Sequence, residues 1–159
     1  MLTIRLQENS LTMDMSKAMN FEGVLKPYGE VFSLLQKQEI DGAENNFSSY
    51  LTSSHYKVAK YYTMDEHLRV PEIIIASEKV LPEISTSDWE IISRVAKETT
   101  EYQKDLWTQM EEKAKEQLIK EGVILIQLED RSSFVEAVKP IYEKYEENYG
   151  DLIRQIKSK

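Results

Sequence analysis

A single long amphipathic stretch, residues 85–122, constrains the fold of this chain more than any other feature. It opens with a Ser/Thr/Asp cluster typical of helix N-termini and closes at Gly122, a residue type that often ends helices. Its apolar residues recur every three or four positions, which predicts one long helix or two nearly collinear ones: Ile91, Ile92, Val95, Tyr102, Leu106, Met110, Ala114, Leu118 and Ile119. At 1.5 Å per residue it would run to roughly 50 Å. That is longer than a single domain of this size ordinarily needs.

The residues before this stretch alternate between strand and helix patterns. Alternating apolar and polar side chains indicate strands, and three- to four-residue steps indicate amphipathic helices. The resulting β-α-β-α order favours an α/β fold with parallel strands. The expected elements are a strand over residues 2–6, a helix over 10–19 capped by Ser10, a strand over 23–28 that ends near Pro27, and a helix from 29 that stops at Asp41-Gly42.

The later segments give patterns of uneven strength. Residues 45–54 indicate a loop or short helix, and the aromatic-rich residues after them could be extended. Ile73–Ala76 and residues 123–128 are bounded apolar runs typical of buried strands. A helix over 130–150 with a kink or break at Pro140, and a terminal helix over 151–158, complete the chain.

Composition excludes several classes of function. With 20 Lys and Arg against 28 Asp and Glu, the net charge of −8 argues against nucleic acid or an anionic membrane surface as the main partner. The absence of cysteine excludes disulfides and thiolate metal sites. The N-terminus lacks the pattern of an export signal, and no apolar run has transmembrane length. Because the chain as a whole is negatively charged, any anionic ligand must be held by local positive charge.

Catalytic signatures are absent from the sequence. There is no glycine-rich phosphate loop, HExxH motif or nucleophile elbow, and most carboxylates sit beside Lys or Arg in helices. His55 and His67 lack the spacing of a common metal site and are interpreted as polar contacts or surface residues. We therefore expect no enzyme activity, no cofactor and no metal.

The stretch "EIDGAENNF", residues 39–47, contains more polar residues than a simple turn requires. Arg5 is similarly unusual, because a lone arginine in an apolar strand either faces solvent or presents its donors to an anion. From the pattern alone Arg5 is expected at the surface. Tyr28 could be a core or a ligand-facing residue, and Asn45 could simply cap the segment that follows it.

Taken together, "TIRLQ", "KPYGEVFSLLQKQEIDGAEN", the long helix and "EGVILIQL" resemble the C-terminal half of the DctP-type solute-binding proteins of TRAP transporters. The resemblance covers nearly the whole chain, and the interval between Arg5 and Asn45 matches that family. It implies a periplasmic-binding-protein-like lobe with a long bridging helix, incomplete relative to the two-lobe family fold. Ala43, Asn20, Gly23 and Lys26 depart from the family pattern.

The resemblance also implies roles for individual residues. Arg5 would pair bidentately with a ligand carboxylate, Tyr28 would pack on the ligand, and Asn45 and His67 would face the cleft. Three further residues would have secondary roles: Glu30 and Glu44, whose charge would repel a carboxylate, and Lys26, which could add a second cation.

Family members are about twice as long, so the resemblance implies that this chain begins inside the second lobe. Residues 1–70 would form the ligand-binding part of that lobe, 71–110 would pack on the first lobe, and 111–159 would return to the second. The strand expected at Ile73–Ala76 would then lack its usual partners, which predicts dimerisation or strand exchange.

The function implied is capture of an organic carboxylate, such as a C4-dicarboxylate or a sugar acid, and delivery to a TRAP membrane permease. The full-length family proteins are extracytoplasmic or periplasmic. The alternative is a truncated helical oligomerisation protein without a ligand, which would depend on the helix face that carries Val95, Leu106 and Met110.

Overall fold

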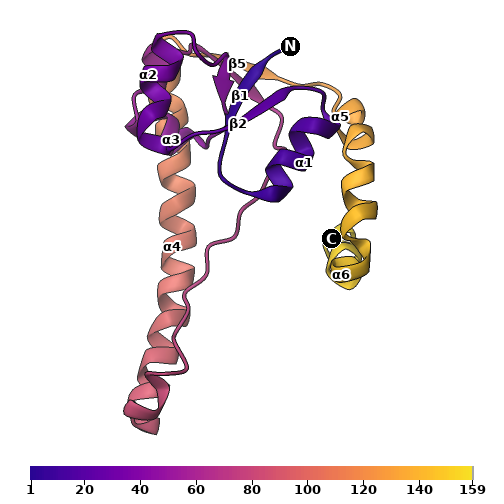
Figure 1. Cartoon of the computed structure of the whole chain (residues 1–159). Helices are drawn as coiled ribbons and strands as arrows, with labels where there is room; N and C mark the ends of the chain where they lie inside the picture. The colour runs from indigo at the N-terminus through magenta and orange to yellow at the C-terminus, as the bar shows by residue number, and fades with distance from the viewer. Residues whose placement is uncertain (159) are drawn as a thin grey trace.

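In the computed structural model, which describes residues 1–158, three parallel strands form the first sheet (Figure 1). Strand β1 (Thr3–Leu6) lies between β2 (Glu22–Leu25) and β3 (Gly42–Ala43). The predicted α/β order and parallel pairing are confirmed. As the central strand, β1 carries Arg5 and Leu6 into the interior, where both are buried.

Helix α1 (Ser10–Ala18) connects the first two strands. Its N-cap is Asn9, whose side chain accepts a hydrogen bond from the Leu11 amide at 2.8 Å, so the assignment of Ser10 as the cap was wrong by one residue. The helix packs tightly on β2 because Gly23 has no side chain. A Cβ there would lie 2.7 Å from Leu6 Cδ1 and from Ser16 Oγ, closer than real contacts allow.

A 3-10 turn (Tyr28–Glu30) leads directly into helix α2 (Val31–Gln36). The helix ends earlier than expected, before Asp41-Gly42. Gln38 adopts a left-handed backbone with φ of 59°, which ends the helix. Val31, Leu35 and Ile40 form one apolar core cluster beneath the first sheet.

A second sheet pairs two strands that lie far apart in the sequence. Strand β4 (Tyr61–Met64) runs parallel to β5 (Ile124–Gln127). The short helix α3 (Phe47–Thr52) and a 3-10 turn (His55–Lys57) precede β4. Tyr50, Tyr56, Leu118 and Val123 form the second core cluster, which joins this region to the long helix. Strand β5 itself is less buried than the sequence indicated, because Ile124 and Ile126 face solvent.

The long amphipathic stretch forms one continuous helix, α4 (Thr86–Lys120), after a 3-10 turn (Leu81–Glu83). Figure 1 shows α4 extending far from the sheets, with its last turns against α3. Ser85 caps it by accepting a hydrogen bond from the Asp88 amide, and Gly122 follows its end with φ of 81°. The sequence predicted one long helix or two nearly collinear ones, and the chain forms one.

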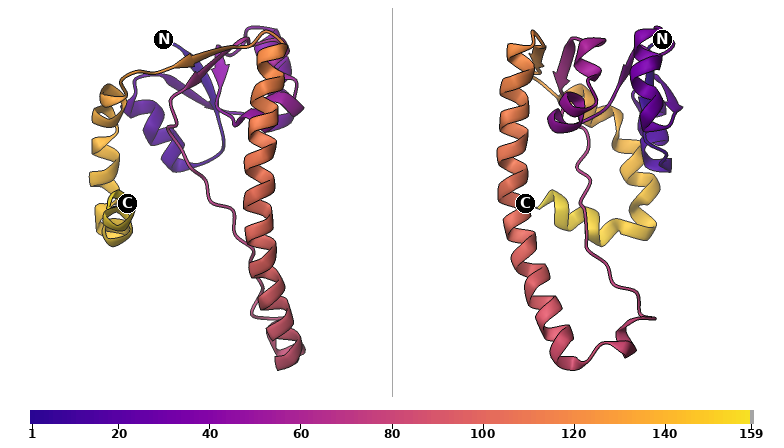
Figure 2. Two further views of the ribbon diagram at one scale, coloured as in Figure 1. Left: turned by 180° about the vertical axis from the view of Figure 1, so that it is seen from behind. Right: turned by 90° about the vertical axis from the view of Figure 1, so that its left-hand side faces the viewer.

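Residues 65–77 form no strand, which corrects the expected strand at Ile73–Ala76. Figure 2 shows this segment running as an extended connection from the sheets toward the start of α4. Its isoleucines are exposed, Ile75 by 81%. A strand needs a neighbour with free backbone donors and acceptors, and no strand among residues 1–158 lies alongside this segment.

Helices α5 (Ser132–Ala137) and α6 (Lys139–Lys157) follow β5. The chain breaks at Val138 just before Pro140, as predicted, but the expected separate terminal helix is the last part of α6. Figure 2 shows α6 changing direction before the C-terminus. Lys144 on α6 holds the carboxylate of Asp14 on α1 at 2.5 Å, which fixes the two helices together.

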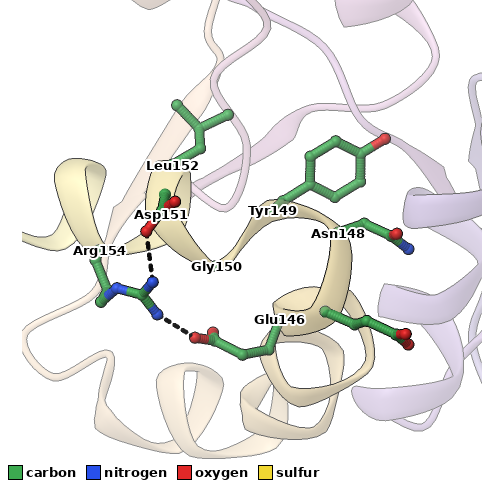
Figure 3. A pocket seen from close by; sticks show the side chains of 8 residues that line it. Glu146, Asn148, Tyr149, Gly150, Asp151, Leu152 and Arg154 are labelled. Atoms are coloured by element: carbon green, nitrogen blue, oxygen red, sulfur yellow. Dashed lines mark hydrogen bonds and ion pairs between the residues drawn. The ribbon is translucent and has the colours of Figure 1, made fainter.

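A shallow hollow follows the bend of α6 (Figure 3). Arg154 donates hydrogen bonds to Glu146 and Asp151, each at 2.6 Å, so its charged groups satisfy one another within a single helix. Gly150 lies beneath the Glu146 side chain, where a Cβ would approach the carboxylate to 2.8 Å.

Among residues 1–158, no helix is both long and apolar enough to cross a membrane.

Candidate functional site

Arg5 is the centre of the candidate site. Its side chain is only 5% exposed, which corrects the expectation from pattern alone that it lies at the surface. The Nε group donates a hydrogen bond to the Lys26 carbonyl at 3.0 Å, and this contact orients the guanidinium. In the described part of the chain the hydrogen bonds of Arg5 use only Nε. Both terminal nitrogens therefore keep donors that could serve a bidentate anion.

Tyr28 lies beside Arg5. The Arg5 Cζ atom is 5.9 Å from the centroid of the Tyr28 ring, within the range of a cation–π contact. The Tyr28 hydroxyl donates to the Ser49 carbonyl at 3.2 Å, which ties this turn to helix α3. Tyr28 is 45% exposed, so part of the residue is within reach of a ligand.

His55 is a member of the site that sequence reasoning missed. It is 3% exposed, and its ring lies 5.6 Å from the Tyr28 ring. Burial lowers the pKa of His55, and the nearby charge of Arg5 lowers it further, so the imidazole stays neutral at neutral pH. No sequence pattern predicts this placement, because it depends on the left-handed turn at Ser54, with φ of 60°.

The polar residues of the Asp-Gly turn have separate tasks. The Asp41 carboxylate accepts a hydrogen bond from the Thr3 amide at 2.7 Å and so fixes the turn beside β1. Pairing of Ala43 with Arg5 in the sheet then places Glu44 next to the guanidinium. Arg5 Nη1 is 3.8 Å from Glu44 Oε1, and this oxygen is buried with no hydrogen-bond partner among the described residues. Glu44 thus balances the Arg5 charge without occupying its donors.

Asn45 follows directly and does not cap the next helix, since Asn46 does so by accepting from the Ser49 amide at 2.7 Å. The Asn45 carbonyl accepts a hydrogen bond from the Tyr62 hydroxyl at 2.7 Å. Burial raises the pKa of Tyr62 to about 12, so this hydroxyl remains a donor across the physiological range.

His67 lies just after strand β4 and is paired with Asp65. Its Nδ1 is 2.8 Å from the Asp65 carboxylate. The hydrogen bond to Asp65 raises the pKa of His67, burial opposes this, and the charge of Glu44 adds to the rise.

The two remaining predicted residues contribute little through their side chains. Lys26 and Glu30 are both exposed, and only the backbone carbonyl of Lys26 engages Arg5. Within residues 1–158, no group of three His, Asp or Glu side chains is placed to hold a metal ion. The site is therefore a buried guanidinium with unused terminal donors, balanced by Glu44 and placed beside an aromatic ring and a neutral imidazole, and those donors could hold an anion.

The family follows from a match over residues 1–148 to the bacterial extracellular solute-binding proteins, family 7, the DctP family. The chain belongs to this family. A solute-binding protein of Chromohalobacter salexigens is 33% identical over 151 residues, which cover 95% of this chain and 45% of that protein.

Two solved structures of TRAP periplasmic solute-binding proteins are similar to the DctP-family fold seen here. One, from Pseudomonas putida F1 with bound D-glucuronate, matches with a TM-score of 0.92 and 35% identity, and covers 99% of this chain and 51% of that one. The other, from a Bradyrhizobium species with bound galacturonate, has a TM-score of 0.90 and 31% identity over 99% of this chain and 53% of that one. The chain thus spans about half the length of these relatives.

Proposed function

We propose that this chain forms the carboxylate-anchoring half of a TRAP-type solute receptor that binds a sugar acid and passes it to a membrane permease. No chemistry on the ligand is part of the proposal, and the receptor would work outside the cytoplasmic membrane. The observation that carries it is Arg5, a buried guanidinium whose terminal donors make no hydrogen bond within the described chain, beside the half-exposed Tyr28.

The electrostatics around Arg5 favour a carboxylate of limited charge. A guanidinium in a partly desolvated site attracts an anion more strongly than an exposed one, and its planar fork matches the two carboxylate oxygens. Glu44, 3.8 Å from Arg5, would repel excess negative charge. A ligand with one carboxylate and several hydroxyls fits these conditions better than a dianion. The uronates bound by the two solved relatives are of this kind.

The ring of Tyr28 supports the same ligand class. Tyr28 is half-exposed and adjoins the guanidinium, so a ligand held by Arg5 through its carboxylate could lay a sugar ring against the tyrosine. Ligand contact from a second lobe would favour a closed form and shift the population toward it.

The test is an NMR titration of this chain with D-glucuronate, D-galacturonate and succinate. We expect saturable shifts at Arg5 and Tyr28 with a uronate Kd on the order of millimolar, because the contacts come from this chain alone. Arg5→Lys should weaken binding at least about tenfold, since an ammonium cannot form the bidentate pair. Arg69→Lys, the same change at an exposed residue, should leave it unchanged.

Two results would contradict the proposal. One is the absence of saturable shifts near Arg5 with all three ligands up to about 50 mM. The other is equal affinity in the Arg5→Lys and Arg69→Lys variants. Tighter binding of succinate than of either uronate would keep the carboxylate anchor but exclude the sugar-acid class.

A second candidate function, self-association without a ligand, is favoured by the exposed apolar face of α4. Val95, Leu106 and Met110 all lie on this face and are exposed in the described chain. Under this alternative, polar substitution of Leu106 would change the sedimentation behaviour, whereas Arg5→Lys would change nothing. The two variants therefore separate the two functions.

A further inference from the structure

One carboxylate of helix α4, that of Glu111, forms hydrogen bonds with the start of helix α3, just after Glu44 and Asn45 in the chain. Glu111 accepts hydrogen bonds from the Phe47 amide at 3.1 Å and the Ser48 amide at 2.8 Å, one with each of its oxygens. These amides open helix α3, where backbone donors have no partner within the helix. The Glu111 side chain, 64 residues after Phe47 in the chain, supplies the hydrogen-bond acceptor that α3 lacks.

The remaining amides at this point are satisfied locally. Asn45 Oδ1 accepts from the Asn46 amide at 3.0 Å, and Asn46 Oδ1 accepts from the Ser49 amide at 2.7 Å. Four consecutive backbone donors are thus fixed, and Glu111 alone fixes the middle two. Loss of its carboxylate would leave both without a partner from the protein.

Packing around Glu111 reinforces the same connection. The Phe47 ring stacks on Tyr62 with centroids 4.5 Å apart, and Tyr62 in turn donates to the Asn45 carbonyl at 2.7 Å. One turn along α4, the Lys115 ammonium lies 5.8 Å from the centre of the Phe47 ring. The short segment between Glu44 and Ser48 is therefore held from α4 on one side and from β4 on the other.

Glu111 also marks a boundary along α4. Ala114 and Leu118, on its C-terminal side, are buried, whereas residues 97–110 on its N-terminal side are exposed throughout. Counting from the exposed N-terminal end of α4, Glu111 is the first residue among 1–158 whose side chain hydrogen-bonds to another element. A change in the direction of α4 would therefore reach the segment of Glu44 and Asn45 first through this carboxylate.

We propose that Glu111 is a positioning residue that fixes Asn45 and Glu44 relative to Arg5 and couples them to the orientation of α4. It touches no ligand itself and acts through the amides of Phe47 and Ser48. The inference rests on the proposed function for its effect on affinity, but its structural part stands independently of any ligand.

The experiment compares Glu111→Gln with Glu112→Gln, a matched control one residue along the same helix. Glu112 is exposed, so its replacement removes the same charge with no loss at α3. A third variant, Glu111→Asp, keeps the charge but draws the oxygens back by one carbon. Each is measured by amide hydrogen exchange and by NMR titration with D-glucuronate.

The glutamine of Glu111→Gln keeps one oxygen that can still accept from one of the two amides, so exchange of at least one of the Phe47 and Ser48 amides should speed about tenfold or more. The Asn45 side-chain resonances should shift, with β1 and α1 unaffected. D-glucuronate affinity should fall about fivefold. Glu111→Asp should show the same pattern, and Glu112→Gln should show none of it. A general rise in exchange over the whole chain would identify a merely structural role and overturn the proposal.

Two further outcomes also decide. If exchange at Phe47 and Ser48 is unchanged in Glu111→Gln, the proposal is wrong whatever the affinity. If exchange rises locally while affinity in a binding-competent chain stays the same, Glu111 holds α3 but does not position the site. Should the unsubstituted chain bind no uronate, the proposed function fails, whereas the exchange and Asn45 shifts still decide whether Glu111 fixes the segment.

Discussion

The two ends of helix α4 follow the same apolar repeat but lie in different surroundings. Toward the C-terminus, Leu118 is completely buried against α3 and the second core cluster. Toward the N-terminus, Leu106 is 45% exposed and Ile92 faces solvent. Periodicity therefore establishes which face of a helix is apolar, but not how much of that face is covered within the chain.

The same contrast separates two regions of the whole molecule. The packed region comprises residues 1–64, the end of α4 from Glu111 onward, and β5. The exposed region comprises residues 65–110, whose isoleucines at 73–75 and helix face carry apolar surface without a buried core. The candidate site lies in the packed region except for His67, which follows β4 at the start of the exposed region.

The largest difference between the regions should appear in amide hydrogen exchange. Amides of residues 70–77 carry no helix or sheet hydrogen bonds, whereas those of β1 lie in the centre of a sheet. We expect exchange in 70–77 to be at least about a thousandfold faster than in β1. Protection of residues 73–75 comparable to that of β1 would show that the segment is covered in solution and would remove the contrast.

Paired substitutions in α4 should show a smaller but clear difference. Leu118→Ala creates a cavity in the second core cluster and should lower the free energy of unfolding by about 2–5 kcal/mol. Leu106→Ala removes the same atoms from an exposed position and should cost within about 1 kcal/mol. Urea denaturation measures both, and equal costs would show that the N-terminal half of α4 is packed as well.

The smallest effect concerns the two histidines of the site. Asp65→Asn removes the partner that raises the pKa of His67, so this pKa should fall, while that of His55, lowered by burial, should not change. A raised folded-state pKa contributes stability that is complete below the ordinary value of 6.5 and is lost as pH rises through the folded value. Asp65→Asn should therefore lower the free energy of unfolding more at pH 5.5 than at pH 8. The difference should be small, as expected for one partly exposed ion pair.

NMR titration of the imidazole protons follows each histidine separately. The prediction would be wrong if the pKa of His67 stayed in place after Asp65→Asn, because the ion pair would then have no energetic consequence. Movement of His55 by the same substitution would show that the boundary and the interior of the packed region are coupled.

Local patterns predicted much of the fold because they depend on near neighbours in the sequence. The parallel β-α-β-α order, the continuous α4 and the break before Pro140 all follow from periodicity and from Gly or Pro positions. The end of α2 did not, since it depends on the backbone of Gln38. The isoleucines at 73–75 were also misjudged as a strand, because a strand exists only where another strand pairs with it.

The candidate site was predicted in outline from family resemblance rather than from the residues alone. Pattern alone placed Arg5 at the surface, because alternation on a four-residue strand does not reveal that both faces are covered. His55 and Glu111 reach their partners only through tertiary packing, and neither has a motif. Arg5 and Tyr28 lie side by side, and the ligand-contacting roles that the resemblance implies for them stay predictions.

The most direct test of the central claim is to observe the Arg5 guanidinium itself while D-glucuronate is added. The Nη protons of Arg5 can be followed by NMR in the unsubstituted chain and assigned by their loss in Arg5→Lys. If Arg5 anchors a carboxylate, these protons will shift saturably and rotate more slowly as the bidentate pair forms. If they remain unchanged while resonances elsewhere saturate, the ligand binds at another place and the account of this site is wrong.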